Sequence, residues 1–133
     1  TNRIRERYSL SFAGDIERLN ALSVAAFCHD IGKEFCKTFQ KPNGELDDIA
    51  HYYGHENVSA YMFILYIKGM LENLEDILYI ADLIGLHMRL FVPEKSKKKV
   101  SNKLKQLIGE RKFEDLCILH RADIECEGRY ENE

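Results

Sequence analysis

Five stretches of this chain repeat apolar residues at intervals of three and four, and this repeat constrains the fold more than any other feature. An interval near 3.6 residues places the repeated side chains on one face of an α-helix. The stretches cover about residues 15–29, 55–70, 74–88, 93–109 and 113–125. Between them there is no convincing alternation of apolar and polar residues, which a half-buried strand would show. The pattern predicts an all-α fold, a bundle of about five or more helices.

The segments between these helices carry turn signals. Gly32 is expected to end the first helix, and residues 32–54 are expected to be mostly loop. The sequence KPNG at 41–44 is a turn signature, because proline fixes φ and Asn-Gly tolerates positive φ. At most a short pair of strands is expected there. In the second helix, residues 61–67 are apolar nearly all round, which predicts that this helix lies at the centre of the core.

Length and composition indicate one soluble domain covering residues 1–133. The chain is 45% hydrophobic and 31% charged, and its net charge of −3 gives no global attraction to nucleic acid or membrane. The longest apolar run, residues 61–67, is too short to cross a bilayer. The four cysteines show no CxxC spacing, which favours reduced thiols and a cytoplasmic location. Because the chain begins at Thr1, we expect it to be an excised part of a longer protein.

Ionisable residues occupy the apolar stripe in four of the five predicted helices. A buried imidazole or carboxylate is costly unless it is paired or bound to a metal. Any one of these residues could be structural, but four helices placing such groups inward is what a metal site in a helical bundle requires. The residues are His29 and Asp30 in the first helix, His55 in the second, His87 in the third, and His120 and Asp123 in the fifth.

The residue types indicate which ions would bind. Imidazole nitrogens and carboxylate oxygens, without cysteine at suitable spacing, suit Mn, Fe, Co, Ni, Zn or Mg rather than a structural cysteine-rich zinc site. A carboxylate can bridge two ions through its two oxygens. Two ions a few Å apart can stabilise both the attacking and the leaving oxygen of a phosphoester. Whether one or two divalent ions bind is left open by the sequence.

Short motifs in the chain resemble those of a known superfamily. HDIGK at 29–33, YGHE at 53–56 with Ser-Ala at 59–60, HMR at 87–89 and RAD at 121–123 follow one another over about residues 15–128. They resemble the HD superfamily of metal-dependent phosphohydrolases. Within it they are most similar to the HD domain that follows the catalytic head of bacterial tRNA nucleotidyltransferases and poly(A) polymerase relatives. The resemblance implies an all-helical fold and hydrolysis of phosphomonoesters or phosphodiesters.

The resemblance also implies roles for individual residues. His29, Asp30 and Asp123 would hold a first metal ion, and Asp30 would bridge to a second ion held by His55 and His87. Asp30 and Lys33 would be the catalytic residues, with Lys33 contacting a substrate phosphate. The implied substrate is a phosphorylated nucleotide or an RNA end that carries a 2′-phosphate or a 2′,3′-cyclic phosphate.

One feature departs from the family pattern. The family has a further histidine ligand upstream of the His-Asp pair, whereas residues 1–28 contain no histidine. We expect that this ligand belongs to a missing upstream helix. The alternative is a non-catalytic HD module that binds nucleotide or RNA, or supports a tRNA nucleotidyltransferase head. Such a module would use Arg89 and the lysine cluster Lys95–Lys105, which could contact tRNA but is first interpreted as a solvated helix face.

Four further residues have simpler interpretations. Lys33 could be an ordinary solvated lysine. His51 is expected to be a loop histidine, because Gly54 separates it from His55. His120 is expected to have a core role or to support a ligand. Glu56 could orient a ligand, or it could interact with the dipole of its helix.

Overall fold

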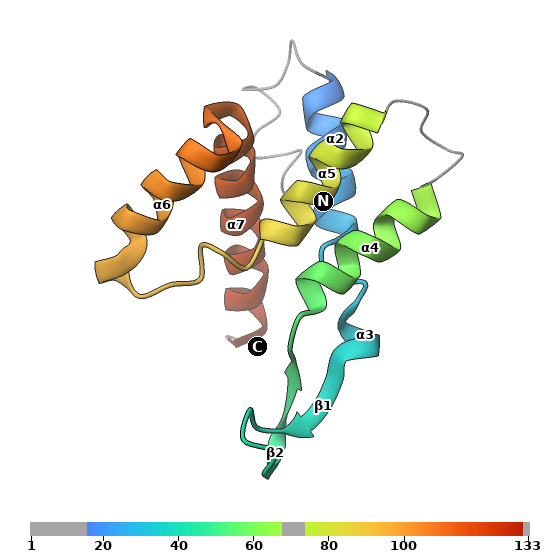
Figure 1. The fold of residues 1–133 in the computed structure, drawn as a ribbon, viewed down its shortest axis with the longest axis vertical. Helices are drawn as coiled ribbons and strands as arrows, with labels where there is room; N and C mark the ends of the chain where they lie inside the picture. The colour runs from blue at the N-terminus through green and yellow to red at the C-terminus, as the bar shows by residue number, and fades with distance from the viewer. Residues whose placement is uncertain (1–15, 68–73, 132–133) are drawn as a thin grey trace.

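The computed structural model describes residues 16–67 and 74–131, and within them it confirms the predicted all-α fold (Figure 1). Position 15, where the first predicted helix begins, and residues 68–70, where the second ends, lie outside the described residues. The elements, in chain order, are α2 (Ile16–Cys28), α3 (Lys33–Cys36), β1 (Lys37–Gln40), β2 (Leu46–Tyr52), α4 (His55–Ile67), α5 (Leu74–Leu86), α6 (Glu94–Ile108) and α7 (Glu110–Glu131).

The core is organised around α5, which packs against α2, α4 and α7. Its buried positions recur at the helical interval, with Ile77, Ala81 and Ile84 inside, whereas Leu74 and Leu78 are exposed. The other helices contribute fully buried side chains to the same cluster, among them Leu22 of α2, Phe63 of α4, and Leu116 and Leu119 of α7.

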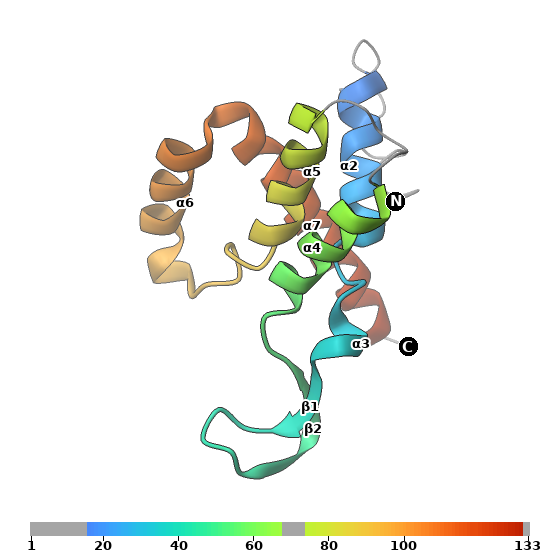
Figure 2. The same cartoon turned by 45° about the vertical axis from the view of Figure 1, so that its right-hand side comes forward.

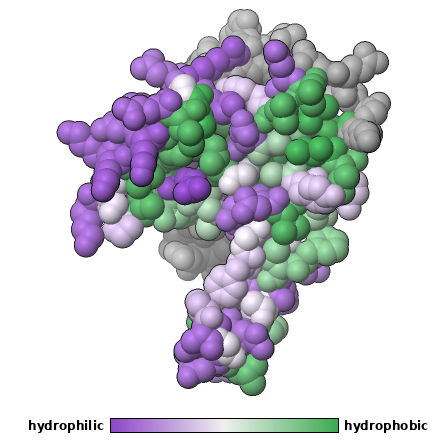
Figure 3. Space-filling model, viewed as in Figure 1, coloured by the Kyte–Doolittle hydropathy of each residue, from purple (hydrophilic) through white to green (hydrophobic). Residues whose placement is uncertain are grey.

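The prediction that the second helix lies at the centre of the core is wrong. Helix α4 buries only His55, Ser59 and Phe63, whereas Tyr61 and Tyr66 are 63% and 66% exposed. An apolar sequence on all sides gives no indication of which face is inward, and α4 packs against α5, α3 and α2. Figure 3 shows hydrophobic side chains gathered over α4 and α5, and hydrophilic ones over α6.

The prediction that residues 32–54 are mostly loop is also wrong. Strands β1 and β2 form an antiparallel hairpin in which Lys37 pairs with Tyr52 and Thr38 with His51. The predicted turn is confirmed: the Gly44 amide donates to the carbonyl of Lys41, and Gly44 has a φ of 88°. Both strands are largely exposed, so no apolar alternation marked them in the sequence. The hairpin projects beyond the helices (Figures 1 and 2).

Gly32 has a different role from the one predicted. Helix α2 ends earlier, at Cys28, and Gly32 has an ordinary φ of −80° just before α3. Its amide donates to Ser59 Oγ at 2.8 Å. A Cβ at this position would lie 2.7 Å from the backbone nitrogen of Ser59. Glycine is therefore required because the backbone packs directly on the first turns of α4, and this brings residues 29–32 close to His55.

Helices α6 and α7 close the bundle on the side opposite α4. Helix α7 begins at Glu110, after Gly109 with its φ of 84°, and so is longer at both ends than the predicted 113–125. Phe113 and Leu104 are buried, whereas Leu107 is 76% exposed. Among the described residues, no helix combines the length and the apolar character needed to span a membrane.

Candidate metal centre

The five residues predicted to bind metal lie in one cluster, in which Asp30 faces three histidines and Asp123 faces His29. They arrive from four places in the chain: the turn after α2 supplies His29 and Asp30, the first turn of α4 supplies His55, the turn after α5 supplies His87, and α7 supplies Asp123. Three of these places are at helix ends, where a short backbone shift can aim a side chain without disturbing the helix.

The two oxygens of Asp30 face different partners. Oδ2 lies 3.1 Å from Nε2 of His29 and 3.4 Å from Nζ of Lys33. Oδ1 lies 3.2 Å from Nε2 of His55 and 3.6 Å from Nε2 of His87. Asp30 thus stands between one imidazole on one side and two on the other, the arrangement that a bridging carboxylate needs.

The three histidines are oriented in the same way. Each places Nδ1 against the carbonyl oxygen three residues earlier: His29 against Ala26, His55 against Tyr52 and His87 against Ile84, at 2.6, 3.0 and 2.6 Å. A carbonyl oxygen only accepts hydrogen bonds, so Nδ1 carries the hydrogen in all three rings. The Nε2 atoms are therefore the free coordinating atoms, and all three point toward Asp30. Backbone carbonyls often fix metal-binding histidines in this manner.

The Nε2 atoms lie too close together to face one another without a positive charge between them. The Nε2 atoms of His55 and His87 are 3.1 Å apart. On the other side of Asp30, Nε2 of His29 lies 3.3 Å from Oδ1 of Asp123. Two nitrogens bound to one ion at about 2.1 Å are separated by about 3.0–3.4 Å in octahedral or tetrahedral geometry. The donor atoms of His29, Asp30 and His87 all lie within 4.8 Å of one another. The spacing therefore fits coordination of a divalent cation.

Electrostatics in the cluster favour a cation as well. Burial alone would lower the pKa of His29, but its hydrogen bonds to Asp123 and Asp30 outweigh burial and raise the pKa to about 10. Burial opposes ionisation of Asp30, yet the contacts with His29 and His87 and the charges of His29 and Lys33 hold the pKa of Asp30 below its usual range. In the metal-free protein a proton on His29 supplies the positive charge that a metal ion would otherwise bring.

The pKa of His29 predicts how the metal-free protein responds to pH. A group whose pKa is raised on folding stabilises the fold fully below its unfolded value of 6.5, and this contribution is lost as the pH rises through about 10. The lowered pKa of Asp30 acts in the opposite sense, so its contribution is present above 3.8 and is lost on acidification. In EDTA, the melting temperature should therefore fall between pH 6.5 and 10, as measured by circular dichroism.

The variant His29→Gln isolates this effect. All other titrating groups are common to the two proteins, so the difference between the two melting curves reports on His29. The alkaline decline of the variant should be shallower than that of the wild type. Parallel declines would contradict the pKa derived for His29.

A cavity of about 410 Å³ opens above Asp30. Cavities of this size hold small ligands. Lys33 lines it, half-exposed, with its ammonium 3.4 Å from Asp30 and 5.3 Å from the ring centre of Tyr52. Asp30, His55 and Asp123 also reach the cavity wall, whereas His29 and His87 lie beneath. A ligand entering the cavity would meet Lys33 and Asp30 together.

Some residues of this region were missed or placed differently by the sequence patterns. His51 lies in β2 rather than in a loop, and it lines the cavity with Tyr52 and Tyr53. The only signal for these residues was the aromatic pair just before Gly54. Glu56 lies 3.6 Å from Nδ1 of His55, whose hydrogen bond goes to the carbonyl oxygen of Tyr52.

His120 occupies a core position beside the cluster. It is buried and packs edge-on against Phe91, with ring centres 4.5 Å apart. Its Nδ1 has no hydrogen-bond partner among the described residues. Burial and the nearby charge of Lys97 lower its pKa, although Asp123 acts in the opposite direction. Its core role agrees with the sequence interpretation.

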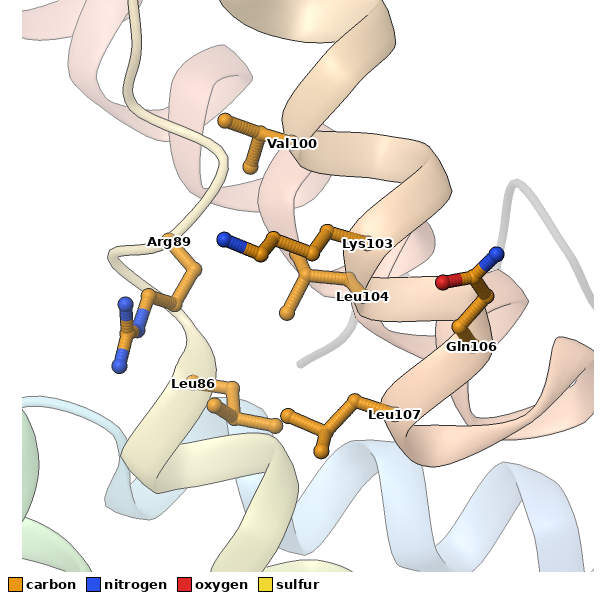
Figure 4. Close-up of a pocket in the computed structure, with 7 residues that line it drawn as sticks. All are labelled: Leu86, Arg89, Val100, Lys103, Leu104, Gln106 and Leu107. Carbon is orange, nitrogen blue, oxygen red and sulfur yellow. The ribbon is translucent and has the colours of Figure 1, made fainter.

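A larger cavity of about 590 Å³ lies elsewhere, between the end of α5 and α6 (Figure 4). None of the side chains that line it is a histidine, cysteine or carboxylate. It therefore lacks the donor atoms for metal chemistry, which the smaller cavity above Asp30 has. The residues that line the larger cavity are Leu86, Arg89, Val100, Lys103, Leu104, Gln106 and Leu107.

Comparison of the chain with protein-family models, with curated proteins and with solved structures finds no match.

Proposed function

We propose that this protein is a metal-dependent phosphohydrolase that uses His29, Asp30, His55, His87 and Asp123 to bind one or two divalent ions. The observation that carries the proposal is the position of Asp30, with one oxygen toward His29 and the other toward His55 and His87. The motif resemblance to the HD superfamily supports the same reading independently of these distances. The proposed substrate is a nucleotide or RNA end carrying a phosphate ester.

Each residue would contribute a defined part of the chemistry. Divalent ions supply a bound water of lowered pKa and neutralise charge on phosphoryl oxygens. Asp30 would keep the two halves of the cluster at a fixed separation, because its oxygens face both. The histidines keep their coordinating atoms aimed inward through their hydrogen bonds to backbone carbonyls. Lys33, at the cavity wall, would hold a phosphate oxygen by a charge-assisted hydrogen bond.

The function is tested by metal content and by hydrolysis of bis-p-nitrophenyl phosphate, with Lys33→Ala as the diagnostic variant. Wild-type protein loaded with Mn²⁺ should hydrolyse the diester, and EDTA should stop it. Lys33 lies 3.4 Å from Asp30, so its removal also removes a positive charge that opposes metal binding. Lys33→Ala should therefore bind Mn²⁺ at least as tightly as wild type. Its kcat/KM should nevertheless fall by about tenfold to 10²-fold, because one donor to the phosphoryl oxygens is lost.

Lys41→Ala is the matched control, since Lys41 is exposed in the hairpin turn and does not line the cavity. It should keep both the metal content and the rate of wild type. Wild-type protein that binds no divalent ion would refute the proposal. Weaker metal binding in Lys33→Ala would refute the phosphate role of Lys33.

A second candidate function is an RNA-binding module without hydrolysis. The observation in its favour is the lysine-rich face of α6, where every lysine is exposed to solvent. Metal binding without hydrolysis of phosphate esters, together with RNA binding that weakens steeply with salt, would select this candidate over the enzyme. The lysines concerned are Lys95, Lys97, Lys98, Lys99, Lys103 and Lys105.

A further inference from the structure

One wall of the cavity above Asp30 is made of rings from the hairpin. His51 and Tyr53 both line the cavity, and their rings are nearly parallel, with centres 5.3 Å apart and an interplanar angle of 6°. Tyr53 is 49% exposed, so the pair is not part of the hydrophobic core. The exposed aromatic surface therefore faces the space that a ligand of the cluster would share.

Hydrogen bonds at both ends hold the two rings in place. Nε2 of His51 lies 2.9 Å from the carboxylate of Asp47, four residues earlier in β2. The hydroxyl of Tyr53 donates to the carbonyl oxygen of Gln40, across the hairpin, at 3.2 Å. Rings fixed in this way lose little conformational freedom when a flat ligand stacks on them.

We infer that the His51–Tyr53 pair is a stacking surface for a nucleobase, and that Tyr53 selects substrates in which a base is attached to the phosphate. Nucleobases stack on aromatic side chains through a face that every base has, so such a surface accepts different bases. Lys33 and Asp30 line the same cavity and would receive the phosphate end. The inference rests on the proposed phosphohydrolase function and adds to it the residues that would contact the base of the nucleotide.

The arrangement favours a base over an aliphatic substrate for a physical reason. A sugar or alkyl phosphate has no π-face to stack on the ring pair that lines the cavity. Stacking on one ring contributes about 1–3 kcal/mol per base. A nucleotide would gain this contribution in addition to the phosphate contacts, whereas a base-free phosphate would not.

The test is the binding of 2-aminopurine riboside 5′-monophosphate in the presence of Mg²⁺, followed by stopped-flow fluorescence before turnover. The protein contains no tryptophan, so the aminopurine signal is observed without interference from indole. Stacking should quench the aminopurine fluorescence when the nucleotide binds wild-type protein. Tyr53→Ala should weaken binding about tenfold or more, and Tyr53→Phe should restore it because the ring is kept. Tyr61→Ala, an exposed tyrosine of α4 outside the cavity, should bind as wild type does.

Ribose 5-phosphate, which has no base, separates stacking from cavity shape. As a competitor of the fluorescent nucleotide, it should bind wild type and Tyr53→Ala within about twofold of each other, since it makes no stacking contact. Equal nucleotide affinity of wild type and Tyr53→Ala would overturn the inference. Equal losses of affinity for the nucleotide and for ribose 5-phosphate in Tyr53→Ala would also overturn the inference. Failure of the proposed function would be distinct: wild type would still quench the nucleotide but would not hydrolyse it.

Discussion

Replacing Asp30 by alanine should remove metal binding and hydrolysis together. The carboxylate faces His29 through one oxygen and His55 and His87 through the other, so its loss takes a donor from both halves of the cluster. Loss of an outer partner of a metal ligand already costs about 10–100-fold in affinity or activity. A residue that faces the ions directly should cost more, and we expect a fall in kcat/KM of at least about 10²-fold.

Thermal stability gives a second readout that does not depend on activity. A metal ion at about 100 times its Kd stabilises a folded protein by about 2.7 kcal/mol when it binds only the folded state. Wild type should therefore melt at a higher temperature with Mn²⁺ than with EDTA, and Asp30→Ala should melt at nearly the same temperature in both.

Two further variants distinguish charge from position. Asp30→Asn keeps the shape of the side chain but removes its negative charge, so it should resemble the alanine variant if the carboxylate binds cations. Asp48→Ala removes an exposed carboxylate of β2 that does not line the cavity, and it should behave as wild type. A metal-dependent rise in melting temperature that survives in Asp30→Ala would show that the ions bind elsewhere.

The sequence could predict the candidate ligands because each stands next to an apolar stripe. His55 and His87 fall at helical intervals from buried positions, and a buried imidazole is conspicuous in such a pattern. Asp30 and Asp123 fall on the same inward-facing stripes, so the sequence also predicted that they lie near these histidines. It could not give the directions of the Asp30 oxygens or the carbonyl contacts of the histidines, because these depend on backbone turns at the helix ends.

The hairpin and the positions of its aromatic rings could not be predicted from the sequence. A strand pair that is exposed on both faces has no alternation of apolar and polar residues, so β1 and β2 looked like loop. The sequence did not indicate that the rings of His51 and Tyr53 stack and line the cavity, because this depends on the folded hairpin. The central position predicted for α4 was wrong for a related reason, since an evenly apolar helix does not indicate how much of its surface is buried.

The second large effect is expected from Gly32→Ala, a change of one methyl group outside the cluster. The new Cβ would lie 2.7 Å from the backbone nitrogen of Ser59 and 2.9 Å from the carbonyl oxygen of His55. Because these atoms belong to the backbone of α4, no side-chain rotation can relieve the contact. Overpacking of this kind costs about 1–3 kcal/mol. The turn carrying Asp30 must move away from His55, so metal affinity should fall along with stability.

Gly85→Ala is the matched control, because the same substitution there should have the opposite sign. Gly85 lies within α5, and its new Cβ would meet only Cβ of Ala60 at 3.8 Å, an ordinary contact. Replacing a helical glycine by alanine stabilises by about 0.5–1 kcal/mol. At about 4 °C per kcal/mol for a domain of this size, Gly32→Ala should melt several degrees below wild type and Gly85→Ala a few degrees above it. If Gly32→Ala matched wild type in both melting temperature and Mn²⁺ affinity, the close packing of this turn on α4 would not be what holds Asp30 beside His55.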